Sequence, residues 1–136
     1  MRGVRGGNVK FGAMFAALLG IAPVGNSTAA NPNGDPEHAV IVRFQYGSTD
    51  LSRLYALEEK LEAAIRAAKA GEFDGDEVAV DGSDGFLYMY GPSGDLLYES
   101  MKPILESCDF MRGAQVTIRY GAANSEVRTK EIRIAP

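Results

Sequence analysis

The chain has 136 residues, of which 46% are hydrophobic and 24% are charged, and its formal net charge is −4. This length fits one domain, and the composition is typical of a globular protein. A disordered polymer, a collagen-like repeat and a multi-span membrane protein are excluded. The single cysteine, Cys108, excludes an internal disulfide and a cysteine-based zinc or iron–sulfur site.

Residues 1–30 have the pattern of a bacterial secretory signal peptide. Three basic residues and no acid accompany an apolar stretch from Phe11 to Val24, which small residues follow at 27–30. The stretch is shorter than the roughly 20 residues of a membrane span. We therefore expect a signal peptide at 1–30, a flexible leader at 31–37 and a single α+β domain at 38–136. The domain would be periplasmic or secreted, with no membrane association after cleavage; an uncleaved N-terminal anchor is the alternative.

Removal of the signal peptide changes the charge of the protein. Cleavage after Ala30 takes away three basic residues and no acid, so the net charge moves from −4 to −7. An acidic domain is repelled by nucleic-acid backbones and by anionic membrane surfaces. We therefore expect no nucleic-acid partner.

The first half of the domain is expected to begin with a strand and a helix. His38–Tyr46 is rich in β-branched and aromatic residues, which predicts a strand. Apolar residues recur at spacings of three and four from Leu51 to Ala68, which predicts a helix. One of the residues 48–50 would cap this helix, and Gly71 would end it. A turn at Glu72–Gly75 would follow.

The rest of the domain is expected to form a hairpin, a second helix and two strands. The hairpin pairs Glu77–Val80 with Phe86–Tyr90 across a turn at 81–85. Ser93 or Asp95 would cap the second helix, which runs toward Cys108 and which Pro103 would kink or divide. The last strands are Ala114–Tyr120 and Glu126–Ile134, the latter charged as an edge strand often is.

The order of these elements is β-α-β-β-α-β-β. Its first six elements match the ferredoxin-like split β-α-β arrangement, and the seventh adds a C-terminal edge strand. Both helices would cover one face of an antiparallel sheet, with the first and third strands at its centre.

Four segments resemble a group of small, uncharacterised bacterial proteins. They are Gly71–Gly75, Leu87–Pro92, Lys102–Leu105 and Arg112–Gly121, and the resemblance extends over roughly residues 38 to 121. It implies the same fold and a bacterial source, but no activity, ligand or catalytic residue. The export segment at 1–30 is a departure from that group.

The face of the sheet turned away from the helices is the main candidate binding surface. If Leu87 and Met89 point to the helices, their neighbours on the strand point the other way. The expected binding residues are Arg43, Gln45, Phe86, Tyr88, Tyr90 and Arg119. Tyrosine and arginine are enriched in protein interfaces. We therefore expect a protein partner or a second copy of the chain to bind here, through this face or an edge strand; the alternative is a face half-covered by the last strand and loops.

Acidic turns offer a second possibility, a small-ligand or weak calcium site. The weak metal candidates are Asp74, Asp76, Asp81 and Asp84, which alternate with glycines. Hard cations prefer several oxygens on a tight loop, but Val78–Val80 interrupts the spacing that an EF-hand needs. Ordinary Asp-Gly turns explain the pattern more simply.

No catalytic residue and no cofactor are predicted. Cys108 as a nucleophile would need His38 as its base, but it falls on the apolar face of the second helix, where a cysteine usually packs in the core. Pairs of acids suited to glycoside hydrolysis arise by chance among 18 acidic residues. The sequence therefore predicts an exported, non-enzymatic binding domain, with an inhibitor or immunity protein as one narrower form.

Overall fold

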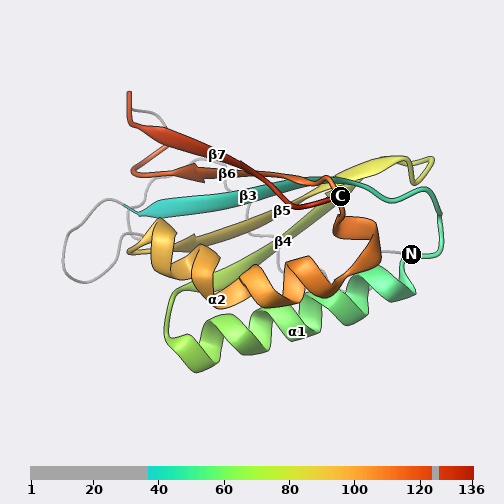
Figure 1. Ribbon diagram of the computed structural model, residues 1–136, viewed down its shortest axis with the longest axis horizontal. Coiled ribbons are helices and arrows are strands. Elements are labelled where there is room, and N and C mark those ends of the chain that lie inside the picture. Colours follow the sequence, from blue (N-terminus) through green and yellow to red (C-terminus); the bar gives the residue numbers. More distant parts are fainter. Residues whose placement is uncertain (1–36, 124–125) are drawn as a thin grey trace, which may run out of the picture.

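The computed structural model describes residues 37–123 and 126–136 (Figure 1). The expected signal peptide at 1–30 and the leader up to residue 36 lie outside the described residues. In the described part, two α-helices, one short 3-10 helix and an antiparallel sheet of five strands form one α+β unit. The predicted α+β class is therefore confirmed. None of the described helices has the length and apolar character needed to cross a membrane.

The five strands form one sheet with the spatial order β4-β5-β3-β6-β7. The first and third strands in the chain are therefore neighbours, as expected, and β4 and β7 are the edges. In chain order the strands are β3 (His38–Gln45), β4 (Glu72–Val78), β5 (Asp84–Gly91), β6 (Gln115–Arg119) and β7 (Thr129–Arg133).

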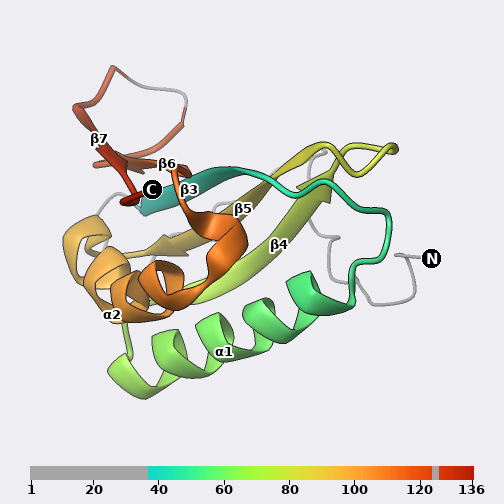
Figure 2. The same ribbon diagram turned by 45° about the vertical axis from the view of Figure 1, so that its right-hand side comes forward.

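Both long helices, α1 (Ser52–Ala68) and α2 (Gly94–Ser107), lie on the same side of the sheet (Figure 1). Figure 2 shows α1 beside β4 and α2 beneath the middle strands. Between the helices and the sheet lies a core of fully buried side chains, among them Val40, Val42, Phe44, Leu54, Leu61, Ile65, Leu87, Met89, Leu97, Met101, Leu105, Val116 and Ile118. Within residues 37–123 and 126–136, no helix covers the other side of the sheet.

The ends of α1 differ from the predicted ones. The N-cap residue is Leu51, and the Asp50 carboxylate accepts the Ser52 backbone N–H (3.0 Å) from one position earlier. Lys69, not Gly71, takes the left-handed conformation that ends the helix, with φ 54°. Gly71 is needed for another reason: a Cβ there would lie 2.0 Å from the carbonyl oxygen of Tyr90 on β5.

The expected turn at Glu72–Gly75 is wrong, because these residues begin strand β4. The pairing with β5 shifts between Phe73 and Gly75, which is the mark of a β-bulge. Gly75 has φ 148°, a conformation that glycine adopts without strain. The glycine that suggested a turn therefore makes a bulge, and Ala79 and Val80, expected in the strand, lie beyond its end.

Helix α2 begins as predicted and ends at Ser107, next to the predicted Cys108. The Ser93 hydroxyl accepts the Leu96 backbone N–H (3.2 Å), so Ser93 is the cap. The helix runs through Pro103 without a second segment. Cys108 is the C-cap residue; its side chain is only partly buried, but it packs against the core as expected. The helix is followed by the short 3-10 turn η5 (Asp109–Met111).

Candidate functional site

The alternation of side chains along β5 sets the two faces of the sheet. Leu87 and Met89 are 0% exposed in the core, whereas Phe86, Tyr88 and Tyr90 are partly exposed on the opposite side. The predicted orientation of this strand is therefore confirmed. On β3, Arg43 and Gln45 are exposed, as the alternation also predicts.

We call the helix-free side of the sheet the open face. The strand register places Tyr88 beside Ile41, Ile41 beside Thr117, and Thr117 beside Glu131 in one row across four strands. The open face is made by Ile41, Arg43, Gln45, Glu77, Phe86, Tyr88, Tyr90, Gln115, Thr117, Arg119 and Glu131. All six predicted binding residues therefore belong to one surface.

The aromatic side chains of β5 form a column on the open face. The rings of Phe86 and Tyr88 are stacked, with centroids 6.1 Å apart and planes 18° from parallel. The Arg43 guanidinium lies 6.0 Å from the centre of the Phe86 ring, within the range of a cation–π contact. This column holds its side chains in place while leaving part of each ring accessible.

The tyrosine hydroxyls of the column stay neutral. The Tyr88 hydroxyl donates a hydrogen bond to the Glu77 carboxylate (2.7 Å), and burial together with this bond raises the Tyr88 pKa well above its ordinary value. Burial and the nearby charge of Asp74 raise the pKa of Tyr90 as well. Both hydroxyls are therefore protonated near neutral pH, so neither acts as a base there.

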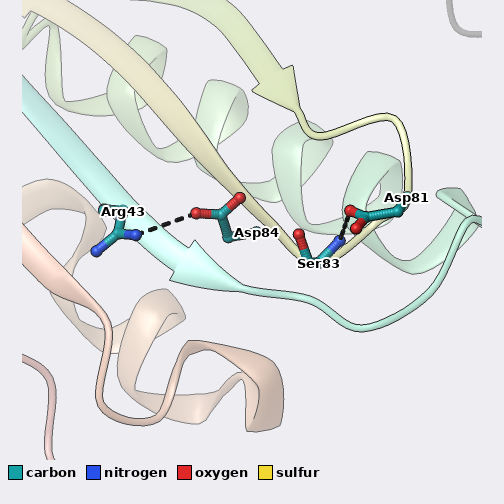
Figure 3. A network of polar contacts seen from close by, with 4 residues as sticks. All are labelled: Arg43, Asp81, Ser83 and Asp84. Atoms are coloured by element: carbon teal, nitrogen blue, oxygen red, sulfur yellow. Dashed lines mark hydrogen bonds and ion pairs between the residues drawn. The ribbon is translucent and has the colours of Figure 1, made fainter.

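A polar contact joins Arg43 to the hairpin turn (Figure 3). Its guanidinium lies 3.2 Å from the Asp84 carboxylate, with side chains that are 57% and 30% exposed. An ion pair this exposed contributes at most about 1 kcal/mol to stability. The ion pair also keeps the Arg43 guanidinium beside the Phe86 ring.

The four weak metal candidates are not brought together as ligands. Asp84 is paired with Arg43, and the Asp81 carboxylate accepts the Ser83 backbone N–H (2.9 Å; Figure 3). Asp76 lies on the helix side of β4, opposite Leu87, whereas Asp74 lies in the bulge. Across residues 37–123 and 126–136, no three His, Cys, Asp or Glu side chains are grouped to hold a metal ion.

One end of the open face carries a group of acids around Arg119. Ala39, which lies between Tyr90 and Arg119 in the register, is 0% exposed. Burial raises the pKa of the neighbouring Glu37, and the charges of Glu72 and Asp74 raise it further, whereas Arg119 lowers it. Glu37, Glu72 and Asp74 therefore lie close enough to one another for their charges to interact, with Arg119 as a neighbouring base.

Five residues of the open face were not among the predicted binding residues: Ile41, Glu77, Gln115, Thr117 and Glu131. Glu77 bonds to Tyr88, and Glu131 accepts hydrogen bonds from Gln115 (2.6 Å) and Thr117 (3.0 Å). Ile41 lies between the aromatic column and Thr117. Alternation from Arg43 would have found Ile41, but the two glutamates depend on the β4 bulge and on the β6–β7 register.

Neither His38 nor Cys108 is arranged for catalysis. The Nδ1 atom of His38 accepts the backbone N–H of Gly94 (2.9 Å), and its ring packs edge-on against Tyr120. Burial raises the pKa of the Cys108 thiol, which disfavours the nucleophilic thiolate. Both side chains have structural contacts at the ends of α2.

Comparisons with known proteins give no match. No family model, no curated protein and no solved structure matches this chain. The resemblance of its segments to small bacterial proteins therefore stays a prediction.

Proposed function

We propose that this chain is an exported, non-enzymatic interaction domain whose open face binds a positively charged protein. We also propose that its first six elements form a ferredoxin-like unit extended by β7. Neutralisation of a basic enzyme, as by an inhibitor or immunity protein, is the narrower form of this proposal.

The observation that carries the proposal is the aromatic column on a helix-free sheet face. Phe86 and Tyr88 are held by stacking and by Glu77, yet keep exposed ring surface. Held aromatic side chains lose little conformational entropy on binding, which is why tyrosine dominates many interfaces. Arg43 and Gln45 add polar groups at the border of the column.

Charge favours a basic protein over a second copy of the chain. After loss of residues 1–30 the chain has a net charge of −7, so two copies repel each other while a basic partner is attracted. Export is supported by the basic start, short apolar stretch and small-residue end of residues 1–30.

Site-specific photo-cross-linking in the source cells tests the proposal. A photoreactive residue at Gln45, on the open face, should trap one basic protein, whereas the same residue at Glu59, on the exposed side of α1, should not. The trapped protein, once purified, should bind about tenfold more weakly to Tyr88→Ala than to the unchanged chain, and more weakly as salt increases. Equal trapping from Glu59, or cross-linking of the chain only to itself, would contradict the proposal.

A further inference from the structure

The outer edge of β4 is a second surface, which borders the open face at Glu77. Within the described residues, β4 pairs with β5 on one side and with no strand on the other. The Ala79 backbone N–H donates to the Asp84 carbonyl (2.9 Å), so the backbone of Ala79 points toward the neighbouring strand β5. Because these bonds alternate along an antiparallel strand, the N–H and C=O groups of Val78 point outward.

An apolar hollow lies beside this outward-pointing backbone. It has a volume of about 530 Å³ and lies between the start of α1 and the end of β4. Its apolar lining comes from Leu51, Val78 and Val80, of which Val80 is 100% exposed. A partner that bound at this strand edge would bury the Val80 side chain.

Acidic side chains predominate along this edge. Strand β4, residues 72–78, contains four carboxylates and no lysine or arginine, and Asp76 and Glu77 line the hollow itself. A second hollow of about 460 Å³, at the other end of β4, is lined by Glu62, Glu72 and Asp74 together with the base Arg66. A segment of another chain that lies alongside β4 therefore meets mainly negative charge.

The bulge decides which part of the edge is able to pair. Because the register shifts between Phe73 and Gly75, the regular part of this edge runs from Asp76 to the end of β4 at Val78, with Val80 beside it in the turn. Two β4 edges from two copies would bring their carboxylates together, which is destabilising. The edge is therefore suited to a different chain, and to a basic one.

We propose that the β4 edge at Asp76–Val80 binds an extended basic segment of another protein by strand addition. The segment's backbone pairs with Val78, and one apolar side chain enters the hollow beside Val80. The lysine or arginine side chains that alternate with it lie on the other face of the added strand, beside Glu77. Strand addition combines main-chain hydrogen bonds with pockets for alternate side chains. Here the outward-pointing backbone of Val78 offers the first, and the hollow beside Val80 offers one such pocket.

The test is a titration of the purified, isotope-labelled chain with a short, capped peptide of alternating lysine and valine, followed by NMR. Saturable amide shifts should be confined to Asp76–Val80 and the neighbouring Leu51. A peptide of alternating glutamate and valine should cause no shifts. The lysine–valine peptide methylated on alternate backbone nitrogens should bind about tenfold more weakly, because it is unable to donate to Val78.

A matched pair of variants completes the test. Val80 and Leu96 are the large apolar side chains exposed in the described part of the chain. Val80→Lys should weaken binding of the lysine–valine peptide about fivefold by repulsion, whereas Leu96→Lys on α2 should leave it unchanged. Val80→Lys should also leave cross-linking from Gln45 unchanged, so failure here is distinct from failure of the open-face proposal. Shifts elsewhere, or equal binding of the methylated peptide, would overturn the inference.

Discussion

Substitutions at neighbouring positions of β5 should separate the core from the open face. Met89 is 0% exposed beneath the helices, so Met89→Ala should lower the free energy of unfolding by about 2–5 kcal/mol through lost burial and a cavity. Tyr88 is partly exposed and has one stacking partner and one hydrogen bond, to Glu77. Stacking is worth about 0.5–1.5 kcal/mol and an exposed hydrogen bond less than about 1, so Tyr88→Ala should cost about 1–2 kcal/mol.

Urea unfolding followed by circular dichroism measures both changes. The slope of the unfolding free energy against urea should stay the same in both variants, so that the midpoint alone reports stability. Gln45→Ala, at an exposed position on β3, serves as a control and should change stability by less than about 0.5 kcal/mol. A cost for Tyr88→Ala equal to that for Met89→Ala would refute the assignment of the two faces, and with it the open face as a binding surface.

Three further predictions concern the glycines Gly71 and Gly75, the pKa of Glu37, and calcium. Gly71→Ala and Gly75→Ala both force φ 148° on alanine, at about 1–3 kcal/mol, but Gly71→Ala alone also pushes a Cβ against the Tyr90 carbonyl. Its melting temperature should therefore be the lower of the two, and equal values would contradict the close approach of α1's end to β5. The raised pKa of Glu37 means that its contribution to stability is present below pH 4.5 and is lost as the pH rises through the folded-state pKa. Glu37→Gln should therefore raise the melting temperature at pH 7, with the difference from the unchanged chain smallest near pH 4; a pH-independent difference would contradict this. Millimolar Ca²⁺ should leave the melting temperature unchanged, because Asp81 and Asp84 already bond to Ser83 and Arg43; a saturable increase would revive the calcium hypothesis.

The parts of the fold that the sequence predicted well are those governed by simple periodicity. Alternation fixed the orientation of Leu87 and Tyr88, and three-to-four spacing from Leu51 to Ala68 found α1 almost to the residue. In both segments local preference and burial favour the same structure, so the pattern alone was sufficient.

The errors fall where backbone conformation is decided by tertiary contacts. Gly71 and Gly75 suggested a helix end and a turn, but β5 fixes both: Gly71 passes close to Tyr90, and Gly75 forms a bulge against Tyr88. Lys69 takes a left-handed conformation that few would assign to a lysine, because backbone bonds to Arg66 and Ile65 close the helix there. The backbone conformations of Gly71 and Gly75 depend on the neighbouring strand β5, which a local sequence pattern does not show.

The two edge strands of the sheet differ in the sign of their charge, which determines how many basic segments can bind. The outer strand β7 has a net positive charge from Lys130 and Arg133 against the single acid Glu131. A basic segment is therefore repelled at β7 and attracted at β4, although within the described residues each of these strands has one side that pairs with no other strand. Charged side chains at an edge discourage unwanted pairing, and here the sign of the charge also selects the edge. A lysine–valine peptide should accordingly bind with one-to-one stoichiometry, since the sheet offers it one edge of opposite charge.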